Sequence, residues 1–290
     1  MIPAPFDYHS PRTLEDALAL LQSHRDEAKV LSGGQSLLPL LKLRLGAAGH
    51  LVDIGRIPGL EYIEEEDGVL KIGGRTRESA LEHSELIQSR YPLLAETAAV
   101  IADPLVRNLA TVGGNLAHGD PANDHPATML ALRAEVVATG PNGARTIPID
   151  RFFLGLFTTA LEPDEILTEI RIPAPPARSG GSYVKLERKV GDFATAASAV
   201  QLTLGAGGEV ASAGIGLTNA GPTPLRASDA EQYLIGKQPG ADVIAEAARL
   251  ASTIAMPSAD RRGAIEYKRQ MARVLTARAL QRAIQWAREH

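Results

Sequence analysis

The spacing of apolar residues predicts a chain in which short strands and helices alternate. From Leu14 to Leu21, apolar residues recur at the spacing of one helix face, and Thr13 before them is a typical N-cap. The same pattern places a helix start at Thr76 and a helix end before Pro104. Helices are predicted over residues 13–21, 37–45, 76–87, 92–101 and 126–132. Strands are predicted over residues 29–31, 51–54, 69–72, 135–139, 146–149 and 166–172.

The pattern changes after a proline- and glycine-rich stretch over residues 173–181, which is expected to be a linker between domains. Beyond it, strands are predicted over residues 183–186, 197–204 and 210–217, and the last two are joined by a glycine-rich hairpin turn. Helices are predicted over residues 226–235, 242–255 and 263–289. This part is therefore expected to be a small α+β domain with an antiparallel sheet and helices on one side.

Two glycine pairs lie where a predicted strand or apolar run leads into a helix. They are Gly33-Gly34, within Leu31–Leu37, and Gly113-Gly114, within Thr111–Asn115. Paired glycines allow positive φ and close approach of the backbone to a ligand, and successive N–H groups at such a turn bind anions. The same residues also suit turns that only needed glycine. Neither pair belongs to the dinucleotide fingerprint or to a phosphate-binding P-loop.

Composition narrows the function classes. The chain has 290 residues, a formal net charge of −4 and no cysteine. It therefore carries no disulfide and no thiolate-ligated iron–sulfur cluster, and its charge argues against general nucleic-acid binding. No apolar run is long enough to span a membrane, and the N-terminus resembles no secretory signal. Residues 261–290 hold eight Lys or Arg against two Glu, which predicts either a solvated helix face or a docking surface.

Other polar clusters leave alternatives open. His118, Asp120, Asp124 and His125 suggest a metal site, a helix cap by one of the aspartates, or an aspartate that binds ligand hydroxyls. Gly119 and Pro121 interrupt any regular presentation of ligands, so we predict no metal site here or elsewhere in the chain. Residues 185–194 combine charges, a glycine and an aromatic ring, which fits an exposed hairpin edge or the wall of a ligand site. No hydrolase elbow is present, and we predict no catalytic residue.

Five segments occur together in a characteristic order. They are Ser32-Gly33-Gly34-Gln35-Ser36, Arg107-Asn108-x-x-Thr111-x-Gly113-Gly114-Asn115, Asp120-Pro121-x-x-Asp124, Glu165-Ile166-Leu167-x-x-Ile170-x-Ile172-Pro173 and Lys185-x-x-Arg188-Lys189-x-Gly191-Asp192-Phe193-Ala194. Together they resemble one family, the FAD-binding medium subunits of molybdenum hydroxylases. The resemblance covers essentially the whole chain and is strongest to the carbon-monoxide dehydrogenase type; the flavin domain of xanthine dehydrogenase is similar.

The resemblance implies an α+β fold with a two-part FAD-binding domain of the vanillyl-alcohol-oxidase type, over residues 1–57 and 58–176, and a C-terminal domain over residues 177–290. It implies that two segments line the FAD diphosphate and ribityl chain: Leu31, Ser32, Gly33, Gly34, Gln35, Ser36, Leu37 and Leu38, and Thr111, Val112, Gly113, Gly114 and Asn115. The first segment contains no histidine, so it resembles the relatives whose FAD is bound non-covalently.

The resemblance also implies roles for residues outside these segments. Asp124 matches a position that hydrogen-bonds FAD, and Ile101, Leu167 and Lys185 match positions at or near the flavin. Asp192 and Phe193 match a pair beside the isoalloxazine ring. The carbon-monoxide enzymes often have tyrosine where this chain has Phe193, so stacking is retained here and a hydroxyl is absent.

The partners that the resemblance implies are a small subunit with 2Fe-2S clusters and a large molybdopterin subunit, in a dimer of heterotrimers. Electrons are expected to reach FAD from the clusters and to leave to an external acceptor, quinone or NAD. The expected location is the cytoplasm or the inner face of the membrane. Medium subunits of xanthine, aldehyde or N-heterocycle dehydrogenases are the alternative, and a non-redox scaffold that kept the fold is an alternative of another class.

Overall fold

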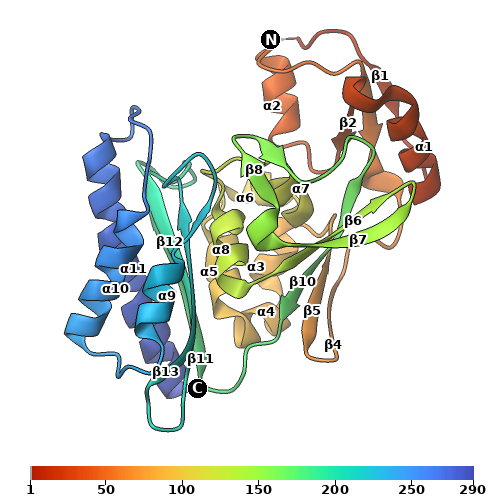
Figure 1. Ribbon diagram of the computed structural model, residues 1–290. Coiled ribbons are helices and arrows are strands. Elements are labelled where there is room, and N and C mark those ends of the chain that lie inside the picture. The colour runs from red at the N-terminus through yellow and green to blue at the C-terminus, as the bar shows by residue number, and fades with distance from the viewer. Residues whose placement is uncertain (1) are drawn as a thin grey trace.

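The computed structural model describes residues 2–290 and has an α+β architecture built on three main sheets (Figure 1). The N-terminal sheet is parallel, with strand order β1-β3-β2, and helix α1 covers it. Thr13 caps α1 as predicted, because its hydroxyl accepts a hydrogen bond from the N–H of Asp16. The elements of this part are β1 (Asp7–His9), α1 (Leu14–His24), β2 (Ala28–Leu31), α2 (Leu37–Lys42) and β3 (His50–Asp53).

The second sheet is antiparallel, with strand order β4-β5-β10-β6-β7. Strand β7 lies at its edge, as expected from the proline that ends it. The strands of this second sheet are β4 (Ile63–Glu66), β5 (Val69–Gly73), β6 (Glu135–Gly140), β7 (Gly143–Pro148) and β10 (Ile166–Pro173), and β8 (Phe153–Gly155) and β9 (Thr158–Thr159) form a separate two-stranded sheet. The helices are α3 (Glu78–His83), α4 (Glu85–Arg90), α5 (Pro92–Ala99), α6 (Pro104–Arg107), α7 (Val112–Ala117) and α8 (Asp124–Leu132).

The third sheet lies between two layers of helices, with α9 to α11 on one face and α5 and α8 on the other (Figure 1). Glycine permits the close contact with α8, because a Cβ at Gly214 or Gly216 would lie about 2 Å from the carbonyl oxygen of Ala131 or Ala127. The helices of the C-terminal part, α9 to α11, therefore lie on one side of the sheet as predicted, while α5 and α8 from earlier in the chain cover its other face. The elements are β11 (Ser179–Leu186), β12 (Ala196–Leu204), β13 (Val210–Thr218), β14 (Leu225–Arg226), α9 (Ser228–Leu234), α10 (Ala241–Thr253) and α11 (Ile265–Glu289).

Several local expectations were wrong for reasons of tertiary structure. Thr76 caps no helix, because its hydroxyl bonds to the backbone of Tyr62, and Arg77 is the residue before α3. Pro104 ends no helix; it begins α6, at the position where a missing N–H is tolerated. The predicted linker is only residues 174–178, because β11 already begins at Ser179. Strands β1 and β4 were not predicted.

Candidate cofactor-binding site

The two glycine segments lie against each other, although 79 residues separate their contacting side chains. The hydroxyl oxygens of Ser32 and Thr111 are 3.0 Å apart. Gly33 packs against the backbone of the residues before Thr111, because a Cβ at Gly33 would lie only 2.3 Å from the carbonyl oxygen of Leu109. The fold therefore brings the two predicted segments together, and glycine at position 33 permits the contact.

The first segment presents a row of unsatisfied donors. Leu31 ends β2, Leu37 begins α2, and Gly34 between them has a φ of 73°. Among residues 2–290, the N–H groups of Gly33, Gly34 and Gln35 find no protein acceptor, although all three residues are partly buried. Partly buried backbone donors need a partner, and consecutive ones form an anion-binding concavity. This arrangement suits a phosphate group.

The second segment differs from the prediction, because its glycines lie inside helix α7 rather than in a turn. Thr111 caps that helix through the N–H of Gly114, and the N–H of Gly113 bonds to the carbonyl oxygen of Gly74. The N–H of Val112 bonds in the same way to the carbonyl oxygen of Thr76. The expectation that this segment offers free N–H groups was therefore wrong.

Asn115 gives the second segment a different polar group. Its side-chain oxygen Oδ1 is buried and has no hydrogen-bond partner among the described residues. Its backbone oxygen accepts a hydrogen bond of 2.9 Å from the amide of Asn123, which fixes α7 against the start of α8. A buried, unpaired amide oxygen costs free energy unless a ligand or water satisfies it. The side chain is thus a candidate donor–acceptor group for a ligand held between the segments.

Asp124, predicted to contact the cofactor, connects two layers of the fold. Its carboxylate accepts hydrogen bonds from the Tyr183 hydroxyl at 2.6 Å and from the Lys185 ammonium at 2.9 Å. Lys185 also donates to the carbonyl oxygen of Val100 at 3.0 Å. Burial raises the pKa of the Asp124 carboxyl, and the charge of Lys185 offsets part of that rise. Whether Asp124 also hydrogen-bonds FAD stays a prediction.

Neither aspartate of the 118–125 segment acts as the predicted cap of α8, and this segment gathers no metal ligands. Asn123 precedes the helix and makes no side-chain cap bond, whereas Asp120 accepts only from the N–H of Ala122. His125 is fully buried and pairs with Glu78, with 2.6 Å between Nε2 and Oε2. Sequence reasoning missed this pair, because nothing local to Glu78 indicates a partner 47 residues away.

The predicted ring-side residues gather around the loop that follows β11. Gly191 packs on Ala102, the residue after buried Ile101, since a Cβ at Gly191 would lie 2.8 Å from the Ala102 carbonyl oxygen. Next in the loop, Phe193 is 47% exposed. The Arg262 guanidinium lies 5.9 Å from the centre of its ring. An aromatic ring held half-open in this way can stack on a planar ligand.

Asp192 anchors the same loop. Its carboxylate accepts hydrogen bonds from Arg262 at 2.7 Å and from Arg188 at 3.0 Å. The Arg262 hydrogen bond lowers the pKa of Asp192 from 3.8 to about 2. Leu167 instead lies buried in β10, where its carbonyl oxygen packs on Gly74 beneath α7. The structure thus places Lys185 and the loop with Asp192 and Phe193 against the segment around Ile101. Leu167 lies elsewhere, beneath α7.

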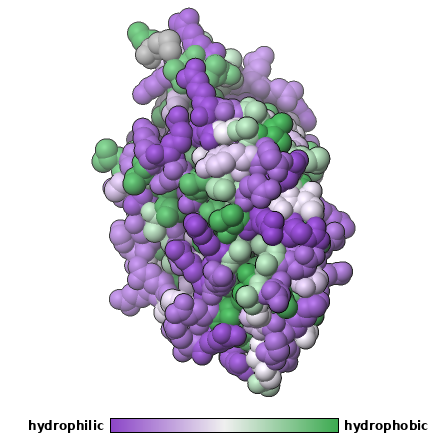
Figure 2. Space-filling view, turned by 90° about the vertical axis from the view of Figure 1, so that its left-hand side faces the viewer, coloured by the Kyte–Doolittle hydropathy of each residue, from purple (hydrophilic) through white to green (hydrophobic). Residues whose placement is uncertain are grey.

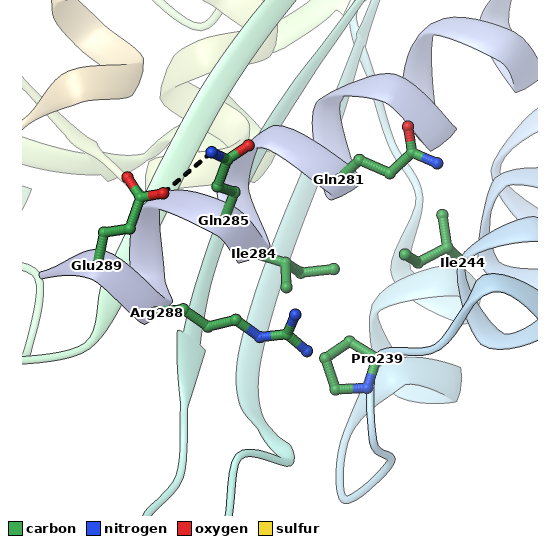
Figure 3. Close-up of a pocket in the computed structure, with 7 residues that line it drawn as sticks. All are labelled: Pro239, Ile244, Gln281, Ile284, Gln285, Arg288 and Glu289. Carbon is green, nitrogen blue, oxygen red and sulfur yellow. Dashed lines mark hydrogen bonds between the residues drawn. The ribbon is translucent and has the colours of Figure 1, made fainter.

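One pocket lies away from the predicted cofactor segments, beside the C-terminal helices. This pocket lies between α10 and α11, and none of the residues that line it was predicted to bind the cofactor. Figure 3 shows the hydrogen bond that Gln285 donates to Glu289 at its rim. The face that carries these helices is largely hydrophilic, with apolar side chains scattered over it (Figure 2). Within residues 2–290, no helix is both long and apolar enough to cross a bilayer.

Comparison with known proteins identifies the family. Residues 4–175 match the FAD binding domain in molybdopterin dehydrogenase, and residues 181–283 match the CO dehydrogenase flavoprotein C-terminal domain. The chain belongs to the FAD-binding medium subunits of the molybdenum hydroxylases. It is a flavoprotein subunit of the carbon-monoxide dehydrogenase type, within a multi-subunit oxidoreductase.

Individual relatives match this chain over nearly the full length of both proteins. The carbon monoxide dehydrogenase medium chain of Hydrogenophaga pseudoflava is 47% identical over 288 residues, which is 99% of each chain. A solved structure of carbon monoxide dehydrogenase from the same organism superposes with a TM-score of 0.96 at 49% identity and covers 99% of both chains. Quinoline 2-oxidoreductase from Pseudomonas putida 86 superposes with a TM-score of 0.93 at 30% identity, again over 99% of both chains.

The residues present fit FAD. The free N–H groups of Gly33, Gly34 and Gln35 suit the anionic diphosphate, and the unpaired oxygen of Asn115 suits a hydroxyl or amide donor. The half-exposed ring of Phe193 suits the flat face of a flavin. The first part of the site would hold the phosphates and the second would flank the ring.

Proposed function

We propose that this medium subunit holds one FAD non-covalently and passes electrons from the 2Fe-2S clusters of a small partner subunit to an external acceptor. The substrate in this proposal is carbon monoxide, oxidised at a large molybdopterin subunit. The observation that carries the FAD site is the row of free N–H groups at Gly33, Gly34 and Gln35, in a segment that contacts the one holding the unpaired side-chain oxygen of Asn115. Full-length similarity to a carbon monoxide dehydrogenase medium chain supports the substrate.

The proposal assigns a task to each part of the chain. Residues 1–57 and 58–176 form the two parts of the FAD domain, and residues 177–290 form the C-terminal domain. The first segment neutralises the diphosphate, and the ring-side residues orient the flavin and limit its contact with water. FAD itself supplies the redox chemistry when bound, so no residue of this chain needs to act as acid or base.

The assembly in this proposal is a dimer of heterotrimers in the cytoplasm or at the inner face of the membrane, with quinone or NAD as acceptor. Two exposed apolar side chains favour a partner near the ring site, because Leu105 in α6 is 80% exposed and Val190 in the loop after β11 is 92% exposed. Neither belongs to the local core, so covering them by another subunit would remove apolar surface from water.

A second substrate class has support from particular observations. Quinoline 2-oxidoreductase shares the fold over the whole chain, and Phe193 departs from the tyrosine that the resemblance associates with carbon-monoxide enzymes. The medium subunit does not touch the substrate in either case, so its site is expected to serve both. The alternative is therefore an N-heterocycle hydroxylase with the same flavin subunit.

Activity of the purified complex decides between them. The complex is supplied with carbon monoxide or with quinoline, and reduction of an artificial electron acceptor is followed by absorbance. Reduction with carbon monoxide alone supports the first proposal. Reduction with quinoline alone would replace carbon monoxide by the heterocycle class, and absence of FAD from an intact complex would remove the redox proposal altogether.

A further inference from the structure

Three histidines meet on the N-terminal sheet, away from the flavin site. His9 ends β1, His24 ends α1 and His50 begins β3. Strands β1 and β3 pair in parallel with Asp7 opposite His50 and His9 opposite Val52. Because alternate strand residues share a face, Asp7, His9 and His50 lie on one side of the sheet, where α1 ends.

The three rings are close enough to share one ion. Each offers a ring nitrogen, and the three nitrogens lie within 4.8 Å of one another. Nε2 of His9 is 3.1 Å from Nδ1 of His50. Ligand nitrogens on one tetrahedral Zn²⁺ lie about 3.4 Å apart, given bonds of about 2.0–2.1 Å. The pair His9–His50 is thus already near the spacing that a metal requires.

All three side chains are partly buried, which limits competition by water without excluding entry of an ion. The carboxylate of Asp7 lies 3.7 Å from Nδ1 of His50, and its side chain is 77% exposed. It is free to turn toward a fourth coordination position. No other group of three potential ligands occurs within residues 2–290.

We propose that His9, His24 and His50 form a binding site for a divalent cation of the zinc class, with Asp7 or water as the fourth ligand. Neutral imidazole favours Zn²⁺, Cu²⁺ and Ni²⁺ over the hard cations Mg²⁺ and Ca²⁺. The His24 ring stacks on His50 with centroids 3.6 Å apart, so it turns out of that stack when the ion binds. This departs from the sequence-based prediction of no metal site.

The site is independent of the flavin. His50 pairs with Ala28 at the start of β2, whereas the glycine segment follows Leu31 at the other end of that strand. An ion bound here would join β1 to α1 and β3, and these last two elements contribute Leu21 and Val52 to the smallest of the core clusters. The expected consequence is a higher melting temperature in the presence of the ion, since ligands that bind only the folded state stabilise it.

Titration with Zn²⁺ tests the proposal. The full chain, in the complex with which it purifies, is freed of loose metal by dialysis and titrated calorimetrically, and its melting temperature is recorded. We expect a binding event that weakens at least tenfold in His24→Gln and in His50→Gln. The control is His83→Gln, because His83 is 75% exposed and lies outside the cluster.

Each result decides the question. The site is supported if both variants bind Zn²⁺ at least tenfold more weakly and show a smaller thermal shift, while their FAD content and circular dichroism stay as in the wild type. Wild-type titration curves in His24→Gln and His50→Gln, or no event in the parent, would overturn it. If His50→Gln does not fold, His24→Gln decides alone, because His24 lies at a helix end rather than in a strand.

Discussion

At Gly33 one methyl group is enough to separate the two halves of the cofactor site. A Cβ there would lie 2.3 Å from the Leu109 carbonyl oxygen and 2.8 Å from Cα of Ala110. Both neighbours are backbone atoms, so the segment before Thr111 has to move as a unit. Glycine at this position is therefore a requirement of the contact between segments and not only of a local turn.

Gly33→Ala is expected to lower FAD occupancy of the purified protein at least tenfold, because the row of free N–H groups moves away from Asn115. Occupancy is measured as released FAD per chain. Gly46→Ala is the matched control, since its Cβ would meet only the Leu40 side chain at 3.9 Å and its φ is not positive. Equal occupancy in the two variants would show that the segments need not touch.

Asp192 makes the ring-side loop sensitive to acid. Its pKa falls from 3.8 to about 2 in the fold, because Arg262 and Arg188 stabilise the carboxylate. A depressed pKa stabilises the folded state fully above the unfolded value and loses that effect as pH falls through the folded value. The contribution is thus present above about pH 4 and disappears toward about pH 2.

Asp192→Asn is expected to lower the melting temperature relative to wild type at pH 5 and above. The difference should shrink as pH falls from 4 to 2, since the wild-type carboxylate then takes up a proton. Paired thermal scans across this range provide the measurement. A difference that is constant with pH would mean that the Asp192–Arg262 ion pair contributes nothing to stability.

At the scale of elements, the buried group of Asp124, Tyr183 and Lys185 joins helix α8 to strand β11. The Lys185 side chain is 4% exposed and that of Asp124 is 7% exposed, so both charges are removed from water. Breaking a buried ion pair by removing one partner leaves the other charge without compensation. The contact between these layers depends on keeping both charges.

Lys185→Met should lower the free energy of unfolding by about 3–5 kcal/mol, because Asp124 then stays buried without its cation. Urea denaturation followed by circular dichroism measures the change. Lys189→Met is the control, since Lys189 is exposed in the loop that follows β11. A loss no larger than that of the control would contradict the importance of the pair.

Helix α11 carries the basic end of the chain, but its charges divide between two environments. Lys268 is 2% exposed and binds Asp260 and the Ser258 carbonyl oxygen, so it belongs to the packed face and not to the basic surface. Arg273, Arg278, Arg282 and Arg288 are exposed to solvent. This division favours a solvated helix face over a docking surface.

Reversing two of these charges tests the distinction. The double variant Arg273→Glu with Arg278→Glu should retain its partner subunits on gel filtration and change the free energy of unfolding by no more than about 0.5 kcal/mol. Loss of partners from an otherwise folded chain would instead identify α11 as a docking surface.

At the scale of the whole molecule, local features were predictable and their tertiary partners were not. The Thr13 cap and the glycine requirement at Gly34 follow from residue types and backbone conformation. The free N–H groups near Gly34 were also expected. The N–H groups at the start of α7 instead donate to the carbonyl oxygens of Gly74 and Thr76. No short-range sequence pattern predicts that these two residues lie next to the helix. Resemblance to the family supplied the ring-side residues, which spacing alone would not have connected.

The domain boundary was likewise predictable from the sequence, whereas the packing of helices across it was not. Composition indicated a boundary within residues 173–181, and in this stretch the chain passes from β10 of the second sheet to β11 of the third. Helices α5 and α8 from before that point nevertheless pack on the third sheet, through glycines such as Gly214 and Gly216. The hydrophobic pattern records that a sheet face is buried, but not which helix buries it.

A visible absorption spectrum of the purified protein, combined with quantification of released FAD, tests the central claim most directly. The account predicts a flavin spectrum and close to one FAD per chain, released by denaturation without proteolysis because the cofactor is not covalently attached. A folded protein in its complete complex that carries no flavin, and takes up none when FAD is added, would contradict it.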